Sequence, residues 1–298
     1  MSIKSISPQS KDYPDYLKEI FDPPGQLYIN SDAADTGRLL KGNNLFAMVG
    51  TRIPSSYGKS IAYKISKEIT ECGGIVVSGL AFGIDAVCHL AAVHLNKPTI
   101  AVLASGIEKI SPGSHLWLAK SIIKSGGLIV SEYRNSDPGF KYKYLKRNRI
   151  ISGLCKATIV IEAKEKSGAL ITARHAFEQN RDIYALTGDI NRPQARGCHK
   201  LIREDNAKPI LDIGHLLDEL GLKTKETAIQ TLDLCAVSIL NLLKKGPRSI
   251  YEIIDELQFS SSEINASIST LELKNLISQN LKWKWILNRD GRYTPHFG

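Results

Sequence analysis

The sequence predicts a doubly wound α/β domain with a mainly parallel sheet, followed by a small winged-helix domain. From Leu45 onward, short apolar runs alternate with segments of helix length, which is the pattern of a parallel sheet covered on both faces. Beyond residue 231 the pattern changes to short amphipathic helices. We expect four parts: an N-terminal cap segment (1–44), the main domain (45–222), a linker (223–231) and the C-terminal domain (232–298).

Six short apolar runs are expected to form the strands of the main sheet. They are residues 45–49, 75–77, 99–103, 128–130, 158–161 and 182–185. Four of the intervening segments have helix length: residues 56–72, 84–95, 116–125 and 170–180. In such a fold, ligands bind beyond the carboxyl ends of the strands, so the loops that follow strands are the candidate sites.

Composition limits the classes of protein to consider. The 298-residue chain contains 43% hydrophobic residues, but it has no signal-peptide pattern and no run near the roughly 20 apolar residues of a membrane span. We therefore expect a cytoplasmic protein that does not enter a membrane. The five cysteines are scattered without a C-x-x-C pair, and the spacing of His89 and His94 puts their imidazoles on different helix faces. Neither a metal site nor a cofactor is expected.

Net charge points to a polyanionic partner. The whole chain carries +9, of which residues 1–44 contribute −1 and residues 232–298 contribute +1. The remaining +9 belongs to residues 45–231, so the positive excess lies in the main domain.

The loop after the first predicted strand begins with Gly50, Thr51 and Arg52 and leads into a helix. Backbone N–H groups at that helix N-terminus, together with Arg52, could hold a phosphate. The loop ends in a P-loop-like Gly-Lys-Ser, but Ile53 stands where the first P-loop glycine belongs, so ATP hydrolysis is not expected. A simple connector with an exposed arginine is the alternative.

The loop after the second predicted strand is rich in glycine. Gly79 and Gly83 would let the backbone approach a ligand closely. Asp85 lies near a helix start and is one helical turn from His89, so we expect a structural hydrogen bond between these two side chains.

A basic stretch with aromatic residues follows the fourth predicted strand, between Tyr133 and Arg149, and is expected to form a loop that leads into a helix. It sets three aromatics among six cations and one acid: Phe140, Tyr142 and Tyr144 among Arg134, Lys141, Lys143, Lys146, Arg147 and Arg149, with Asp137. Cations attract phosphates and aromatic faces stack on unpaired bases, so this composition favours single-strand binding. A solvated loop with its aromatics in the core is the alternative.

A small-residue turn, Ser167-Gly168, follows the fifth predicted strand and feeds a helix. Such a turn can form an anion nest, with Ser167 and Thr172 as hydroxyl donors, or it can be an ordinary N-cap. Three segments are expected to share the carboxyl edge of the sheet: Gly50-Thr51-Arg52, the basic stretch and Ser167-Gly168.

Several motifs occur in an order that resembles one family. They are Val49-Gly50-Thr51-Arg52, Ser78-Gly79-Leu80-Ala81-x-Gly83-Ile84-Asp85, Ser131-Glu132, Arg147-Asn148-Arg149-Ile150-Ile151-Ser152-Gly153-Leu154, and Glu162-Ala163 with Ser167-Gly168 to Thr172-Ala173. The chain resembles the DprA (Smf) DNA-processing proteins over roughly residues 13–210. The resemblance implies an extended Rossmann-like domain that binds single-stranded DNA without sequence preference and performs no catalytic step.

The resemblance also implies a biological setting. Such a protein forms homodimers, protects incoming DNA and helps to load RecA recombinase during natural transformation. With the loop analysis, the expected DNA-binding residues are Gly50, Thr51, Arg52, Gly79, Phe140, Lys143, Tyr144, Lys146, Arg147, Asn148, Arg149, Ser167, Gly168 and Thr172. Of Arg147 and Arg149, at least one is expected to bind backbone carbonyls rather than DNA.

The C-terminal domain is expected to contain helices at residues 234–244, 250–257 and 262–274, followed by a short β-wing at 283–287. The third helix would be the recognition helix, yet it carries one lysine against Glu263 and Glu272. Since groove-binding helices need cations, we favour a protein-interaction or regulatory role over DNA binding. Trp283 and Trp285 are two apart and are expected to pack on the domain's own core.

Two other functions stay open. A nucleotide phosphoribohydrolase similar to the LOG-type enzymes would need a Pro-Gly-Gly-x-Gly-Thr-x-x-Glu signature, and residues 162–172 lack its double glycine. A winged-helix regulator whose larger domain senses a ligand is the other possibility, which the slightly acidic third helix disfavours.

Overall fold

The computed structural model describes residues 2–33, 35–222, 233–273, 276–280 and 283–288. The chain divides into two compact units, residues 1–225 and 226–298, which we call the N-terminal and C-terminal units. No described helix combines the length and apolar character that crossing a bilayer requires.

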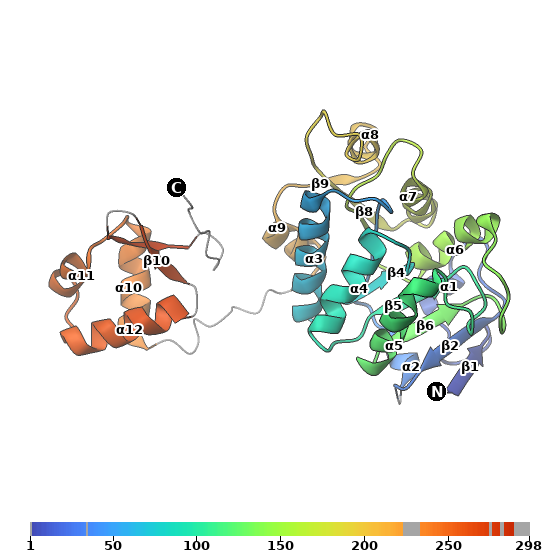
Figure 1. Cartoon of the computed structure of the whole chain (residues 1–298), viewed down its shortest axis with the longest axis horizontal. Coiled ribbons are helices and arrows are strands. Elements are labelled where there is room, and N and C mark those ends of the chain that lie inside the picture. The colour runs from blue at the N-terminus through green and yellow to red at the C-terminus, as the bar shows by residue number, and fades with distance from the viewer. Residues whose placement is uncertain (1, 34, 223–232, 274–275, 281–282, 289–298) are drawn as a thin grey trace. The chain divides into compact units, whose positions relative to one another are not determined.

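The described part of the N-terminal unit contains one nine-stranded sheet in the order β1-β2-β6-β5-β4-β3-β7-β8-β9 (Figure 1). The strands are β1 (Ser2–Ile6), β2 (Leu27–Ser31), β3 (Leu45–Val49), β4 (Ile75–Ser78), β5 (Ile100–Leu103), β6 (Leu128–Ser131), β7 (Ala157–Val160), β8 (Asp182–Leu186) and β9 (Lys208–Ile210). The strands from β3 to β9 pair in parallel. The mainly parallel sheet is confirmed, and each of the six predicted strands agrees within one residue at either end.

The N-terminal segment extends this sheet. Strand β2 pairs antiparallel with β6, and β1 pairs antiparallel with β2 at the edge. Strand β1 is therefore the edge strand of the sheet (Figure 1). Residues 1–44, which were expected to pack on the main domain as a cap, supply two strands and two short helices to it.

Helices cover both faces of the sheet. They are α1 (Asp15–Lys18), α2 (Thr36–Leu40), α3 (Ser56–Glu71), α4 (Ile84–His94), α5 (Leu116–Lys124), α6 (Lys141–Gly153), α7 (Gly168–Glu178), α8 (Arg196–Arg203) and α9 (Ile213–Glu219), with a 3-10 turn at Gly113–His115. Strand β3 is buried throughout, and its alternate residues face opposite cores. Leu45, Ala47 and Val49 pack toward α1, α6 and α7, whereas Phe46 and Met48 pack toward α3, α4 and α9.

The order of the strands defines a switch point. The chain builds β3, β4, β5 and β6 outward in one direction and then returns through α6 to place β7 against the other side of β3. In doubly wound sheets, the crevice beyond the carboxyl ends of the strands at such a reversal is where ligands bind. Here those ends are Val49 of β3 and Val160 of β7.

The basic stretch, which was expected to form a loop that leads into a helix, is mostly helix α6. The segment is helical from Lys141, so most of its cations lie on a helix rather than on a loop. The helix is buried from Arg147 to Gly153, and a Cβ at Gly153 would lie 3.0 Å from Leu17 and from Ile20. The glycine therefore permits the close approach of α6 to the segment around α1.

The C-terminal unit contains α10 (Leu234–Lys244), α11 (Ile250–Glu256) and α12 (Ser261–Leu273), followed by the hairpin of β10 (Ile277–Gln279) and β11 (Trp285–Leu287). A backbone bridge joins Arg248 to Trp285. Trp285 is buried in the core of the unit, as expected. Trp283 precedes the strand at a positive φ of 56° and is 77% exposed, so the expectation that it packs on this core was wrong.

The expected hydrogen bond between Asp85 and His89 was also wrong. His89 Nδ1 lies 2.9 Å from Thr99 Oγ1, whose hydroxyl donates to the Val76 carbonyl. Thr99 therefore accepts from the imidazole, which fixes the neutral tautomer that is protonated on Nδ1. The imidazole is fully buried, and its burial, with the nearby charges of His115 and Arg147, lowers the pKa of His89 to about 3.

Buried His89 should make the fold sensitive to acid. Its folded pKa lies below its ordinary value of 6.5, so the unfolded chain binds a proton that the folded chain cannot bind, and stability falls as the pH drops from 6.5 toward 3. We expect the free energy of unfolding to fall by about 2 kcal/mol more in the wild type than in His89→Gln between about pH 7 and about pH 5. Urea titrations at both pH values measure this difference, and equal losses in the two proteins would contradict it.

Candidate nucleic-acid interface

A cavity of about 200 Å³ lies at the switch point, between the loops after β3 and β7 and the helices α6 and α7. It brings together eight of the predicted site residues: Gly50, Arg52, Tyr144, Arg147, Asn148, Ser167, Gly168 and Thr172. Segments about 100 residues apart in sequence therefore converge at one edge, as the position of the loops after parallel strands requires.

Arg52 and Tyr144 form an exposed cation and aromatic pair at this cavity. The Arg52 guanidinium lies 5.4 Å from the centre of the Tyr144 ring, within the range of a cation–π contact. The Tyr144 hydroxyl is 2.8 Å from Ser111 Oγ, so the loop after β5 fixes the ring. Arg52 is exposed, and no ion pair of its guanidinium occurs among the described residues. It is free to receive a phosphate.

Arg147 lies in the wall of the cavity but is turned into the protein. Its side chain is almost fully buried, and Nη1 donates to the Gly79 carbonyl at 2.7 Å and to the Val102 carbonyl. Nε donates to Asn148 Oδ1 at 3.1 Å. Of the two arginines, Arg147 is thus the one that binds backbone carbonyls.

Asp85 adds a buried carboxyl group to the same wall, and the sequence did not assign it to the site. Burial raises the pKa of the Asp85 carboxyl, while attraction to the Arg147 guanidinium opposes that rise. Burial lowers the pKa of Arg147, and Asp85 opposes that change too. The two groups therefore stabilise each other's charged forms inside the protein.

Arg149 and Lys143 are also engaged within the fold. Arg149 is buried, donates to Glu132 Oε1 at 2.6 Å and lies 3.0 Å from Asp22. Lys143 is buried, forms an ion pair with Asp137, and lies 4.3 Å from the centre of the Tyr133 ring. Both cations hold α6 to its surroundings rather than facing solvent.

Lys146 and Phe140 face outward. Lys146 is 46% exposed and lies 3.7 Å from Glu132 Oε1, a distance at which an exposed lysine is held only weakly. The Phe140 ring is 53% exposed and stacks on Tyr142, with ring centres 6.1 Å apart. These side chains give the solvent-facing part of α6 its basic and aromatic character.

The turn before α7 is an N-cap with an open approach. Ser167 Oγ accepts from the Ala169 N–H at 3.3 Å, which makes it the cap of the helix. Asn148 Nδ2 donates to the Gly168 carbonyl at 3.2 Å, while a Cβ at Gly168 would meet nothing within 4 Å. Thr172 is buried one turn further on. The start of α7 is thus accessible beside Arg52.

The start of α3 already holds a carboxylate of the protein. Glu162, which follows β7, accepts from the Ser55 N–H at 2.9 Å and from the Ser55 hydroxyl at 2.6 Å. A Cβ at Gly58 would lie 2.3 Å from this carboxylate. A carboxylate of the protein thus lies at the N-cap of α3. Whether a phosphate binds at this N-terminus or the loop is a simple connector stays a prediction.

The glycines expected to approach a ligand instead approach protein atoms. A Cβ at Gly79 would lie 2.6 Å from the Arg147 guanidinium, and one at Gly50 would lie 2.5 Å from the Ile84 side chain. Gly83 has a φ of +80° and packs against the backbone of Thr51 and Arg52. Buried Thr51 is tied to this arrangement through its N–H, which donates to the Glu162 carbonyl at 2.6 Å.

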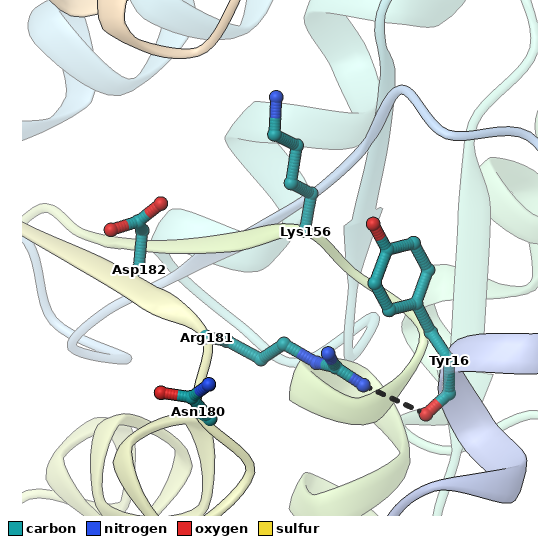
Figure 2. A pocket seen from close by; sticks show the side chains of 5 residues that line it. All are labelled: Tyr16, Lys156, Asn180, Arg181 and Asp182. Carbon is teal, nitrogen blue, oxygen red and sulfur yellow. Dashed lines mark hydrogen bonds between the residues drawn. The ribbon is translucent and has the colours of Figure 1, made fainter.

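A second, larger hollow of about 430 Å³ lies where β7 and β8 begin, at the opposite edge of the sheet (Figure 2). It is lined by Tyr16, Lys156, Asn180, Arg181 and Asp182. Figure 2 shows the Arg181 side chain reaching the Tyr16 carbonyl, to which Nη2 donates at 2.9 Å. Lys156 donates to the Leu220 carbonyl at 3.3 Å. Both cations bind backbone carbonyls of neighbouring segments. The residues that line this hollow include none from the loops after β3, β4 or β7.

Comparison of the chain with known proteins identifies its family. The model of the family described as DNA recombination-mediator protein A matches residues 4–221. DNA processing protein DprA of Bacillus subtilis is 40% identical over 218 residues, which cover 73% of this chain and 71% of that protein.

Two solved structures share the fold. DNA processing protein A of Streptococcus pneumoniae superposes with a TM-score of 0.67 at 36% identity, covering 74% of this chain and 75% of that one. The protein of the same name from Helicobacter pylori, whose structure describes how it binds single-stranded DNA, gives a TM-score of 0.66 at 26% identity, covering 74% of this chain and 96% of that one. With the family model matching over most of its length, the chain belongs to the DNA recombination-mediator protein A family, the DprA (Smf) proteins.

Proposed function

We propose that the chain binds single-stranded DNA without sequence preference at the switch-point cavity and along the outer side of α6. The observation that carries this proposal is the exposed Arg52 guanidinium beside the Tyr144 ring, next to the accessible start of α7. A cation for the phosphate and an aromatic face for the base are the two elements of sequence-tolerant single-strand binding. The relative from Helicobacter pylori binds single-stranded DNA, which supports the same ligand here.

The predicted site residues divide into two groups in this proposal. Arg52, Lys146 and the backbone at Ser167 and Gly168 contact phosphates, while Tyr144 and Phe140 stack on bases. The other group shapes the site without touching DNA and consists of Gly50, Thr51, Gly79, Lys143, Arg147, Asn148, Arg149 and Thr172. Its members are buried or packed against protein atoms, and its three cations all have partners within the fold.

The wider role follows the family. We propose that the protein acts in natural transformation as a non-enzymatic homodimer in the cytoplasm, protecting incoming DNA and helping to load RecA recombinase. A phosphoribohydrolase activity is disfavoured because Glu162, the acid that directly follows the end of β7, accepts hydrogen bonds from Ser55 at the start of α3. Release of free base from nucleoside monophosphates would revive that alternative.

For the C-terminal unit we propose a winged-helix fold with a protein-interaction or regulatory role. Three helices followed by a hairpin that bridges back to Arg248 support the fold. Two of its described cations are paired internally: Lys284 lies 3.0 Å from Glu252, and Arg248 lies 2.9 Å from Glu256. Glu263 at the start of α12 accepts from Ser260. This distribution disfavours both duplex binding and the winged-helix regulator.

Changing Arg52 or Tyr144 should weaken single-strand binding. We expect Arg52→Glu to raise the Kd for an oligothymidylate by about 10-fold or more and to reduce the salt slope by about 0.7, because one phosphate contact is lost. Tyr144→Ala should raise the Kd by about 5-fold or more because stacking is lost, whereas Tyr144→Phe, which keeps the ring, should not. Fluorescence anisotropy measures these affinities. Lys97→Glu, which changes an exposed cation where β5 begins, is the control, and an unchanged affinity of Arg52→Glu would refute the site.

Arg147→Ala should act through stability. The substitution leaves Asp85 buried without its cation and removes the donor to the Gly79 and Val102 carbonyls, so we expect a loss of about 3–5 kcal/mol in the free energy of unfolding. Arg52→Ala, on the surface, should change it by less than about 0.5 kcal/mol. Urea unfolding compares the two variants. A stable Arg147→Ala protein with abolished DNA binding would instead make Arg147 a direct DNA contact.

Removal of the C-terminal unit should leave single-strand binding intact. We expect a truncation that ends at Leu222 to bind single-stranded DNA within about twofold of the full chain, because each proposed contact lies in the N-terminal unit. Neither protein should prefer duplex DNA. Gel shifts with single- and double-stranded probes measure this, and loss of a duplex complex on truncation would show that the C-terminal unit binds DNA.

A further inference from the structure

A second exposed aromatic ring lies on segments next to the cavity, with one cation over it and two more on the adjoining segments. We call this group the Tyr57 patch and define it as Tyr57, Lys164, Arg192 and Arg196. The Arg192 guanidinium lies 5.7 Å from the centre of the Tyr57 ring, which is 42% exposed in the first turn of α3. Arg196 begins α8, and Lys164 belongs to the loop after β7. No local sequence pattern predicts this group, because its members come from three separate segments.

Backbone contacts hold these segments together. The Gly197 N–H donates to the Ala163 carbonyl at 2.8 Å, and the Ala163 N–H donates to the Gln194 carbonyl at 2.7 Å. A Cβ at Gly197 would lie 2.9 Å from the Lys164 carbonyl oxygen, so the start of α8 packs directly on the loop after β7. The Tyr57 patch is therefore built by the fold.

The patch is continuous with the cavity. The Ser167 N–H donates to the Lys164 carbonyl at 2.9 Å, so one tight turn connects Lys164 of the patch to Ser167 in the cavity wall. On the α3 side, Tyr57 follows the loop that begins with Arg52. A ligand that occupies the cavity therefore has a basic and aromatic surface directly beside it.

The cations of the patch are available to a ligand. Arg192 lies 4.0 Å from Asp189, and both side chains are about half exposed. Such an exposed ion pair contributes little to stability, so it leaves Arg192 available. Within the described ranges, Lys164 and Arg196 have no ion pair. The acids close by in sequence are Glu162, Glu165 and Asp189, and Lys166 adds a fourth cation to the three of the patch. The surface is net positive and suits a polyanion.

We propose that the Tyr57 patch binds the nucleotides of the same single strand that follow the one in the cavity, with bases stacking on Tyr57 and phosphates contacting Arg192, Arg196 and Lys164. The inference rests on the proposed function and extends its site across β7 toward α8. Ile53, which is 75% exposed and four residues before Tyr57, adds apolar surface for a base. Since Glu162 occupies the start of α3, the side-chain cations are the groups on this side that remain for phosphates.

Oligonucleotide length provides the test. The full chain is titrated with fluorescein-labelled oligothymidylates of about 6 and about 20 nucleotides, one near the lower end of the roughly 4–16 nucleotides that an OB fold covers and one longer than that range. For Arg192→Glu/Arg196→Glu we expect the Kd of the long strand to rise by about 10-fold or more and its salt slope to fall by about 1.4. The short strand, held at the cavity, should keep its Kd within about twofold.

Substitution of Tyr57 separates stacking from charge. Tyr57→Ala should raise the Kd of the long oligonucleotide by about 5-fold or more, and Tyr57→Phe should bind it like the wild type because the ring is kept. The matched charge control is Lys97→Glu/Lys124→Glu, which reverses two exposed cations at the other edge of the sheet, where β5 and β6 begin.

The outcomes distinguish the two proposals. A wild type that binds neither strand refutes the proposed function. A wild type that binds both, with long-strand losses in Arg192→Glu/Arg196→Glu no greater than in the control, refutes the Tyr57 patch alone. Equal losses on short and long strands also refute it, because the cations would then act at the cavity.

Discussion

The buried guanidinium of Arg147 is the interaction on which the candidate site depends. It comes from α6, which connects β6 back to β7, and it donates to the carbonyls of Gly79 after β4 and Val102 in β5. A buried charge is costly unless it is hydrogen-bonded and balanced, and here two carbonyls and the charge of Asp85 provide that balance. The glycine at position 79 leaves the space that the guanidinium fills. Arg147 thereby fixes α6, and with it Tyr144, over the carboxyl ends of the strands.

The basic residues of α6 consequently serve two purposes. Lys143, Arg147 and Arg149 are buried and bind Asp137, backbone carbonyls and Glu132, so they set the position of the helix. Lys146 lies between them in sequence but faces solvent, beside the exposed Phe140 and Tyr142 rings at the start of the helix. A helix with polar residues on every side can be stable in this place because its buried cations are paired. Net charge alone therefore overstates the number of cations that a ligand can reach.

The sequence predicted the strands well because each is a short, continuous apolar run that the parallel sheet buries on both faces. It did not predict α6 as a helix from Lys141, since the segment lacks an apolar period and its buried positions are cations whose partners lie far away in sequence. The convergence of Arg52, Tyr144 and Ser167 followed from strand order and could be anticipated. The split between Arg147 and Lys146 could not, because it depends on carbonyls of β5 and of the loop after β4. Tyr57 and Arg192 were missed because they are 135 positions apart and carry no shared motif.

Glu162 explains why single-stranded DNA would contact side-chain cations on one side of the cavity and the start of a helix on the other. Two helices begin near the switch point, and both N-termini attract anions. The carboxylate of Glu162 already accepts from Ser55 at the start of α3, whereas at α7 the cap is the neutral hydroxyl of Ser167 and Gly168 leaves the approach open. A phosphate near α3 would meet a fixed negative charge, so its favourable positions lie at α7, at Arg52 and at the cations around Tyr57. An internal carboxylate can thus direct a polyanion across a surface as effectively as the cations that bind it.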